Sequence, residues 1–435
     1  MYFPAWPPRL GRCAIPLVLA IVPLHAATLP ELISLAFERN GELQAMRARA
    51  VEARALVRQA GLRPNPNLDV SYGNGPVFGS AGETDFTVGV SQTIETGRKR
   101  LRRISVAEAE LREIEWQIAD RERLLRNAIA TAYADWLGLS RNEANSRRLL
   151  ELTRQSLSLV KARVAQGEAS VLEESLLQVE SNRLEADLLI FSGQRERAEL
   201  ALLTVAGIAD AEAPPLTGDL PSLAAPFAGP LSPAEEIAAA LRSRPDLAGL
   251  RAAELTGDQA IELEKSIARP SVIAFSRFSH SHQQSDAFGY STVRPTGALI
   301  AVTDRDNIIT GGINIALPFK NRNQGNIAAA VARKDGARLR RAFLEQIIER
   351  EIRSALLRVS TTLRASELFG QGVVALAEKN LEVIRKAYEL GELRLLDVIN
   401  EQRRFVEIQR TYTDTLKERV LAQIELDRVR GAAKP

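Results

Sequence analysis

One stretch of this chain occurs twice and decides the fold: VAQGEASVLEESLLQ at residues 164–178 returns as YELGELRLLDVINEQ at residues 388–402. The copies lie 224 positions apart, and in each a glycine interrupts a long run of helix-forming residues. An acidic residue follows six positions after the glycine, where a second helical run begins. A repeat of about 200 residues has the size of a domain and is too long for a solenoid unit. The sequence therefore predicts two equivalent halves, residues 28–207 and 234–431, around one pseudo-axis.

Long helices are predicted in both halves by apolar residues that recur at spacings of three, four and seven. The region 98–165 contains almost no glycine or proline, and about 68 residues of helix would span about 100 Å. Patterns of this length without internal caps are typical of coiled-coil packing. The predicted helices are 29–62, 98–165 and 171–205 in the first half, and 234–268 (as more than one helix), 326–389 and 394–429 in the second.

Segments with a period of two precede each long helix. Leu68, Val70 and Tyr72 alternate with small or polar residues, and the same alternation returns around Ile309 and Ile313. Strands with one apolar and one polar face are the weak signature of a membrane β-barrel, although a hairpin packed on a helix would alternate in the same way. We predict strands within 67–95 and 271–318, interrupted by turn-rich loops at 74–82 and about 280–307.

The first 27 residues have the composition of a secretory signal peptide. Two arginines precede an apolar run that is too short to span a bilayer, and small residues suited to cleavage follow. The only cysteine, Cys13, directly follows Arg12 and lacks the apolar run that precedes a lipidated cysteine, so we expect no lipid anchor. The mature chain then has no cysteine and no disulfide framework.

The remaining bulk features exclude other classes of protein. Residues 208–233 contain six prolines and are predicted to be an extended linker rather than an element. The net charge is only +3 and the charges are interspersed, which indicates solvated helix faces and no nucleic-acid partner. No stretch after the signal reaches about 18 apolar residues, so no transmembrane helix is expected.

Barrel closure then sets the number of chains. Four strands per chain cannot close a membrane barrel, because the smallest such barrels need about eight strands and an open edge leaves backbone groups unsatisfied in lipid. Three copies would supply twelve strands and twelve long helices. The predicted fold is therefore mainly α with a membrane β-barrel part: a trimeric 12-stranded β-barrel continuous with a 12-helix α-barrel.

At this point the chain resembles the outer-membrane factor (TolC-like) family of efflux ducts over essentially its whole mature length. The motif that carries the resemblance is Tyr388-x-x-Gly391 followed by Leu396-Asp397-Val398-Ile399 and Gln402, with its degenerate first copy at 164–178. The segments 59–66 and 91–100 resemble the heavy-metal branch, which serves cobalt–zinc–cadmium resistance pumps. Asn400 departs from relatives that carry a second acid three residues beyond Asp397.

The resemblance implies a function without a catalytic step or a cofactor. It implies a homotrimeric duct in the bacterial outer membrane, with its helices in the periplasm. The duct would contact outer-membrane lipid and dock on a periplasmic adaptor (membrane fusion protein) and an inner-membrane, proton-driven resistance–nodulation–division pump. Two alternatives stay open: a soluble periplasmic coiled-coil adaptor or scaffold, and a drug-exporting duct of the same family. No constellation for acid–base or nucleophilic catalysis is visible, so we do not expect an enzyme.

The tips of the helical hairpins supply the candidate site residues. Acids at the start of the returning helices can cap orphan amides, or three-fold symmetry can turn them into a ring at the narrow end of the duct. The candidate gate residues are Glu173, Asp397 and the basic neighbour Arg394. The candidate adaptor contacts at the tips are Gly167, Glu168, Gly391 and Glu392.

Two further groups of charged or titratable residues are candidates outside the tips. Arg98, Lys99 and Arg100 directly follow a predicted strand, which suits an anchor at the periplasmic lipid headgroups. His280 and His282 are the only histidines after the signal, but they lack the further ligands of a tight metal site, so we expect a solvated loop and no metal.

Overall fold

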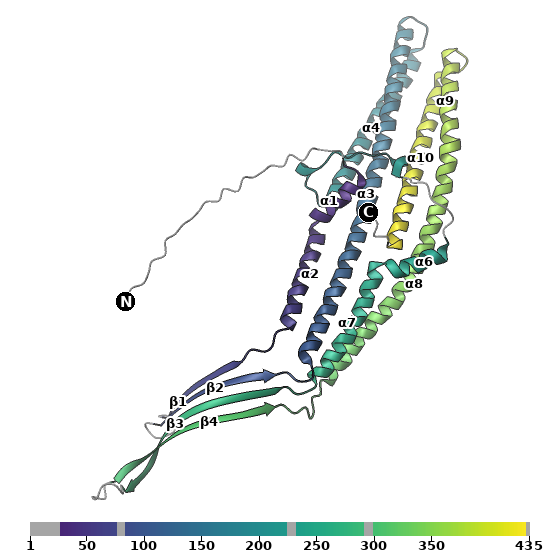
Figure 1. Cartoon of the computed structure of the whole chain (residues 1–435). Coiled ribbons are helices and arrows are strands. Elements are labelled where there is room, and N and C mark those ends of the chain that lie inside the picture. Colours follow the sequence, from purple (N-terminus) through teal and green to yellow (C-terminus); the bar gives the residue numbers. More distant parts are fainter. Residues whose placement is uncertain (1–26, 76–82, 224–231, 291–298, 432–435) are drawn as a thin grey trace, which may run out of the picture.

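A computed structural model describes residues 27–75, 83–223, 232–290 and 299–431 of the 435-residue chain. The molecule is elongated: an antiparallel sheet forms one end, and long helices extend from it to two hairpin tips at the other (Figure 1). The predicted signal peptide lies outside the described residues except for Ala27, and so does its Cys13. None of the described helices is long and apolar enough to cross a membrane.

Each half contains helices, two strands and two long helices in the same order. The first half comprises α1 (Leu29–Arg39), α2 (Gly41–Ala60), β1 (Asn67–Asn74), β2 (Thr84–Ile94), α3 (Lys99–Ala165) and α4 (Val171–Ala206). The second comprises α6 (Pro233–Ser243), α7 (Pro245–Ile267), β3 (Val272–Tyr290), β4 (Leu299–Ile315), α8 (Gln324–Leu368), α9 (Val374–Glu389) and α10 (Leu395–Arg430). The ends of the four predicted long helices fall within two residues of these bounds.

The prediction of one helix over 29–62 is wrong, because the chain breaks at Asn40. The side-chain oxygen of Asn40 caps α2 by accepting the amide of Leu43 at 3.0 Å, and its amide nitrogen donates to the carbonyl of Val205 in α4, also at 3.0 Å. The second half breaks at Arg244, in front of Pro245, which begins α7 with its fixed φ. The first break is therefore stabilised by a side-chain cap and by contact with the end of α4. The second is stabilised by the proline and by a hydrogen bond from Arg244 to the carbonyl of Val429 at the end of α10.

The long helix of the second half contains one irregular turn. A π-helical segment, Phe369–Val373, joins α8 to α9 within the region predicted as a single helix 326–389. A Cβ atom at Gly370 would lie 2.9 Å from the hydroxyl oxygen of Tyr412 in α10, so a larger residue here would displace the tyrosine side chain. The extra residue in the turn accommodates the close packing of α10 against this point.

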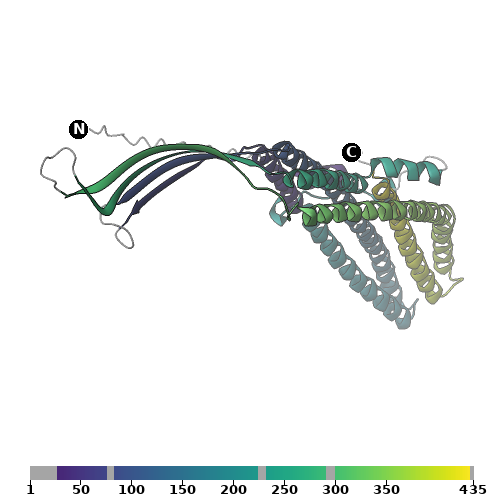
Figure 2. The ribbon, with the colours of Figure 1, turned by 90° about the horizontal axis from the view of Figure 1, so that it is seen from below.

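The strands form one four-stranded antiparallel sheet in the order β1-β2-β3-β4. The central pairing joins the two halves, with Val88 opposite Phe278. β1 and β4 are the edges, and the sheet bends as it leaves the helices (Figure 2). Because the edges have no partner within the described chain, the sheet ends in two rows of exposed backbone groups.

The predicted loop at about 280–307 is wrong in most of its length. β3 continues to Tyr290 and β4 begins at Leu299, so the hairpin extends well beyond β1 and β2. Where the structure describes this region, its polar residues therefore belong to two paired strands. Residues 76–82, most of the loop predicted at 74–82, and residues 291–298 lie outside the described part of the chain.

The segment predicted as an extended linker is packed rather than free where the structure describes it. It contains a short 3-10 turn at Asp210–Glu212 and one turn of helix, α5 (Leu220–Leu223). Leu220 is fully buried, and the hydroxyl of Tyr133 in α3 donates to the carbonyl of Thr217. Residues 224–231 lie outside the described part. The described part of this segment thus covers the core where α1, α3, α4 and α10 meet.

Candidate functional site

The two hairpin tips share one backbone conformation. Gly167 and Gly391 both have positive φ, 74° and 79°, at the end of the outgoing helix. In each tip the glycine amide donates to the residue three before it, and the next amide reaches five residues back: Glu168 to Arg163 and Glu392 to Ala387, both at 2.9 Å. This is the hydrogen-bond pattern of a glycine-terminated helix. Both glutamates are exposed, so the tips present carboxylates to solvent.

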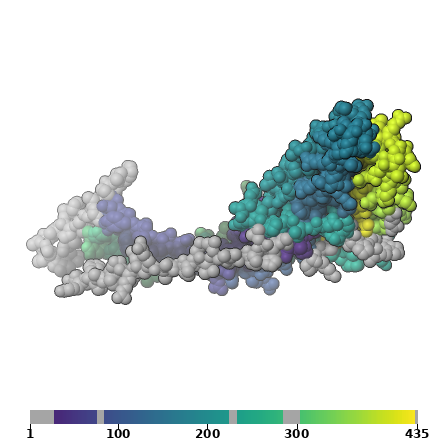
Figure 3. Space-filling view, turned by 90° about the horizontal axis from the view of Figure 1, so that it is seen from above, coloured from purple at the N-terminus to yellow at the C-terminus, as the bar shows by residue number. Residues whose placement is uncertain are grey.

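The tips of the two halves pack together through an apolar cluster. Its buried members come from α3, α4 and α10 and are Leu157, Val160, Leu177, Leu395 and Ile399. Tyr388 of α9 is partly buried and packs against them. We call this set the tip cluster. In Figure 3 the blue-teal hairpin of α3 and α4 lies beside the yellow-green hairpin of α9 and α10. The tip cluster therefore forms the far end of a seam between the halves.

One hydrogen bond crosses this seam directly at the tips. The hydroxyl of Tyr388 donates to Oε2 of Glu173 at 3.3 Å. Partial burial raises the pKa of Tyr388, and the negative charge of Glu173 raises it further. The phenol is therefore a stable donor at neutral pH. The residue expected to partner the gate acids was Arg394, and the structure instead brings Tyr388 to Glu173.

Asp397 has the geometry of a helix cap. Its Oδ2 accepts the backbone amide of Arg394, the N-cap residue of α10, at 3.2 Å. Within the described part of the chain, the Arg394 guanidinium makes no ion pair with Asp397, and both side chains are exposed. In the first half the corresponding cap is Ser170, whose hydroxyl oxygen accepts the amide of Leu172 at 3.1 Å. Because Ser170 caps α4, the carboxylate of Glu173 is available to accept the hydrogen bond from Tyr388.

A buried ion pair crosses the seam farther from the tips. Glu180 in α4 is 3% exposed, and its Oε2 accepts from two nitrogens of Arg403 in α10, at 2.6 and 3.0 Å. The hydrogen bond to Glu180 raises the pKa of Arg403 above that of a free guanidinium. Beside this pair, Gln402 is also buried, and its Oε1 has no hydrogen-bond partner among the described residues. The seam thus contains polar groups where a coiled-coil core would carry apolar ones.

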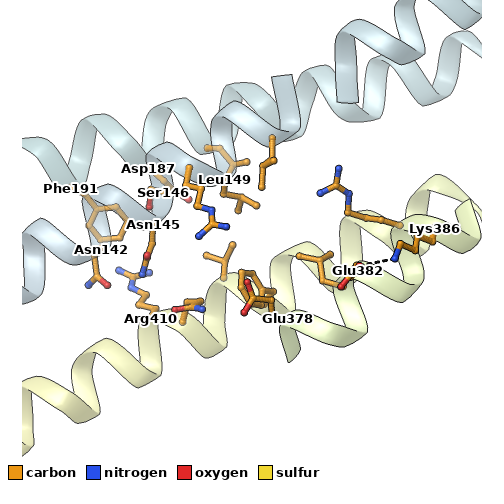
Figure 4. Close-up of a pocket in the computed structure, with 18 of the residues that line it drawn as sticks. Asn142, Asn145, Ser146, Leu149, Asp187, Phe191, Glu378, Glu382, Lys386 and Arg410 are labelled. Carbon is orange, nitrogen blue, oxygen red and sulfur yellow. Dashed lines mark hydrogen bonds and ion pairs between the residues drawn. The ribbon is translucent and has the colours of Figure 1, made fainter. Parts of the chain in front are cut away.

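Away from the tips, the hairpin of α3 and α4 and the hairpin of α9 and α10 enclose a groove of about 470 Å³ (Figure 4). Its apolar floor includes Leu149, Leu184 and Phe191. Arg410 lies over the ring of Phe191, 5.0 Å from its centroid. The α9 wall carries Glu378 and the exposed pair Glu382–Lys386, whose charged atoms are 2.7 Å apart. The groove is therefore amphipathic and open along the seam.

Arg244, which lies between α6 and α7, connects this break in the chain to the rest of the second half. The guanidinium is almost fully buried and pairs with Asp246 at 2.6 Å and Glu351 at 2.5 Å. Although burial opposes ionisation, the hydrogen bond and charge of Arg244 lower the pKa of Asp246. Arg123 of α3 adds a contact to Asp246 at 3.6 Å and donates to the carbonyl of Arg428. This network joins α3, α7, α8 and α10.

The predicted headgroup anchor lies at the junction of sheet and helices. Arg98 is exposed and adopts a left-handed conformation, φ 62°, as the N-cap of α3. Lys99 is half-buried and donates to the hydroxyl of Ser271 at 2.7 Å, while Arg100 donates to the carbonyl of Gly61 at 2.6 Å. Two of the three cations therefore also hold the junction together, and Arg98 is the most available to a lipid.

The histidines are on a strand, so the expectation of a solvated loop is wrong. Nδ1 of His280 lies 2.8 Å from Oδ1 of Asn307 on β4, and Nδ1 of His282 accepts from Nε of Arg305 at 3.4 Å. Among the described residues, no group of three or more histidine, cysteine or acidic side chains is placed to hold a metal ion.

Two functional contacts were not predicted from the sequence, although each has a local signal. Glu180 and Ser181 interrupt the apolar spacing between Leu177 and Leu184, which indicates a polar layer in the seam. Tyr388 stands where the first copy has Val164, a difference between the repeats that marks a position with a special partner. The identity of each partner required the three-dimensional structure.

A four-stranded sheet and two long helical hairpins with glycine tips define the class of protein by its fold: an elongated, mainly helical chain with a sheet at one end. The family model described as outer membrane efflux protein matches residues 32–208. The chain is 23% identical over 415 residues to the cobalt-zinc-cadmium resistance protein CzcC of Cupriavidus metallidurans, covering 94% of this chain and 92% of that protein. It is 27% identical over 308 residues to the outer membrane protein OprJ of Pseudomonas aeruginosa, covering 70% and 60%.

The fold is shared with a solved structure of CusC, described as forming a transmembrane channel. The TM-score is 0.72 at 19% identity, and the match covers 93% of this chain and 92% of that one. The chain is therefore similar to outer membrane efflux proteins in sequence and to CusC in fold.

Proposed function

We propose that this protein is the outer-membrane channel of a tripartite efflux system for heavy-metal cations. The observation that carries the proposal is the full-length match to a cobalt-zinc-cadmium resistance protein, together with two glycine-tipped hairpins at the far end from the sheet. The chain would be a passive exit duct. Its partners would be a periplasmic adaptor and an inner-membrane, proton-driven resistance–nodulation–division pump, with the exposed tip glutamates and glycines as adaptor contacts.

The open edges of the sheet support a trimer. Within the described residues the outer edges of β1 and β4 are unpaired, and in lipid their backbone groups would be unsatisfied. Pairing β4 of one copy with β1 of the next would close twelve strands in three copies, within the range of known membrane barrels. The helices would then continue the barrel into the periplasm. The mass of the detergent-solubilised protein tests this: a trimer is expected, and a stable monomer would contradict the architecture.

The seam contacts support a gate at the tips. Tyr388–Glu173 and Arg403–Glu180 each join the two halves within one chain, and loss of either would allow the hairpins to move apart. We propose that these bonds hold the duct closed, and that Asp397 and Glu173 are the carboxylates nearest to its opening at the tips. This replaces Arg394 by Tyr388 as the nearest partner. Single-channel conductance in planar bilayers measures the resting opening.

Transport is tested in cells. Deletion of the gene should sensitise the host to cobalt, zinc or cadmium when the cognate pump and adaptor are present, and the full-length chain should restore resistance. Restoration of resistance to organic drugs but not to metals would favour the alternative of a drug-exporting duct. Recovery of the protein in the soluble periplasmic fraction would favour the adaptor alternative instead.

A further inference from the structure

The two faces of the sheet differ in chemistry because side chains alternate along each strand. Cross-strand neighbours share a face, which places Tyr72, Phe86 and His280 together in one row and Val70, Val88 and Phe278 in the next. We call this the apolar face; its exposed members are Leu68, Val70, Tyr72, Phe86, Val90, Phe278, Ile309, Ile313 and Ile315. The opposite, polar face carries Asp69, Asp85, Thr87, Arg277, Ser279 and Thr310, with Ile273, Phe275 and Ile308 as apolar exceptions.

The apolar face has a length that suits a bilayer. On β2 its exposed side chains run from Phe86 to Ile94, and on β4 from Ile309 to Ile315. The stretch from Phe86 to Ile94 covers roughly 26 Å of strand, or about 20 Å after the usual tilt of a barrel strand. That is most of the roughly 25 Å height of the apolar band of outer-membrane barrels. Leu317 and Phe319, which are 62% and 77% exposed, follow after β4 has ended.

Beyond Ile309, away from the helices, the same face becomes polar on β3 and β4, while β1 and β2 still carry Tyr72 and Phe86 in the next row. The next row pairs His280 with Asn307, and the row after it pairs His282 with Arg305. The second of these rows is also the last that all four strands share, since Asn74 and Thr84 end it on β1 and β2. The chemical change therefore coincides with the outer limit of the complete sheet.

Alternation separates the charges of this region by face. In the sequence Asp304-Arg305-Asp306-Asn307, the two acids belong to the polar face, because Asp306 pairs with Ser281 and Ser281 with Asp85. Arg305 belongs to the apolar face. The face that meets lipid thus ends in a cation and hydrogen-bond donors, while the acids lie on the other side of the sheet.

The hydrogen bonds fix which donors are offered. Arg305 donates through Nε to Nδ1 of His282, so Nδ1 is the acceptor and the imidazole proton is on Nε2. This bond uses one edge of an exposed guanidinium. A guanidinium beside an imidazole N–H is a donor set that matches the oxygens of a phosphate group.

We propose that Arg305 and His282, with His280 and Asn307 below them, form a binding site for the phosphate of an anionic lipid headgroup in the outer leaflet. The inference rests on the proposed outer-membrane location. The ligand is a lipid rather than a soluble anion because the pair directly continues the apolar face, so acyl chains along Val70, Phe278 and Ile309 would bring a headgroup phosphate to this level. The predicted anchor at Arg98 would occupy the opposite, periplasmic level of the same barrel.

The test measures lipid binding to the purified full-length protein in detergent. Native mass spectrometry would count bound bisphosphorylated lipid A, with phosphatidylcholine as the zwitterionic comparison. The wild type should retain lipid A in preference to phosphatidylcholine. Arg305→Gln combined with His282→Ala should weaken lipid A binding by roughly tenfold, because charge-assisted hydrogen bonds to the phosphate are lost. The single variant His282→Ala should weaken it less.

A matched control is Arg277→Gln, which removes an exposed arginine of β3 on the polar face. Lipid A binding should be unchanged in this variant. Equal binding by the wild type and by the Arg305→Gln, His282→Ala variant would overturn the proposal. So would displacement of lipid A by millimolar inorganic phosphate, which would indicate a soluble-anion site. A wild-type protein that is monomeric or lacks a heat-stable barrel would instead contradict the proposed function.

Discussion

Tyr388 donates a hydrogen bond to Glu173 across 3.3 Å, joining residues 215 positions apart in the sequence. The phenol belongs to the last turns of α9, and the carboxylate belongs to the first turn of α4. One bond therefore ties the tip of the second hairpin to that of the first. A duct that opens by separating its hairpins must break this contact.

Tyr388→Phe should raise the resting conductance. The ring and its apolar packing are kept, while one hydrogen bond to a carboxylate is lost, worth about 1 kcal/mol or roughly a fivefold shift per protomer. Planar-bilayer recording is the measurement. Tyr412→Phe is the control, since it removes a hydroxyl from α10 away from the tips. Equal conductance of the Tyr388→Phe variant and the wild type would mean that the bond does not hold the closed state.

The same contact should make opening sensitive to alkaline pH. Burial and the charge of Glu173 raise the pKa of Tyr388 in the folded hairpin above its ordinary value of about 10. For a group with a raised pKa, the stabilisation is complete below the ordinary pKa and is lost as pH rises through the raised one. Conductance should therefore increase only above about pH 10. If the conductance of Tyr388→Phe rises with pH by the same amount, groups other than Tyr388 cause the rise.

Two substitutions at Asp397 distinguish the effect of its negative charge from its role as a cap of α10. Asp397→Asn keeps a side-chain oxygen for the amide of Arg394, whereas Asp397→Ala removes the cap at a cost of about 1 kcal/mol. If the carboxylate faces the aperture, both variants should lose cation preference, but only the alanine variant should lower the melting temperature. Reversal potentials under a salt gradient report the selectivity. Unchanged selectivity in Asp397→Asn combined with Glu173→Gln would leave both acids outside the pore.

Gly391→Ala tests the backbone conformation of the tip. A Cβ atom would meet nothing within 4 Å, so the cost comes from φ alone and should be about 1 kcal/mol. Gly193→Ala is the matched control: it has the same free space within α4 and no positive φ, and it should stabilise by about 0.5–1 kcal/mol. Thermal unfolding compares the two. We expect Gly391→Ala also to weaken adaptor binding, and normal metal resistance with a lowered melting temperature would show a structural role only.

Arg403→Met tests the buried pair in the seam. The variant leaves the carboxylate of Glu180 buried without its cation, which should cost about 1–3 kcal/mol; this is less than for a fully buried pair because Arg403 is 47% exposed. Combining it with Glu180→Gln should recover part of the loss. The solvent-exposed pair Glu382–Lys386 is the control, and Lys386→Met should leave stability unchanged. Equal melting temperatures of Arg403→Met and Lys386→Met would show that the buried pair does not stabilise the seam.

Local patterns in the sequence determined much of the architecture. The spacing of apolar residues indicated the four long helices, because a helix buries one face at a period that is visible in a single segment. Gly167 and Gly391 indicated the two tips, since positive φ favours glycine over other residues. Alternation around Leu68 and Ile309 indicated a two-faced sheet. These features depend on contacts between residues close in sequence.

Contacts between distant residues decided the rest. The break at Asn40 depends on the carbonyl of Val205, 165 positions away, and the extension of β3 beyond His280 depends on its pairing with β4. Tyr388 rather than Arg394 meets Glu173, because the packing of the tip cluster brings α9 against α4. Neither spacing nor composition encodes which side chains face each other across a seam. The partners of Glu173, Glu180 and His282 were therefore determined only by the tertiary structure.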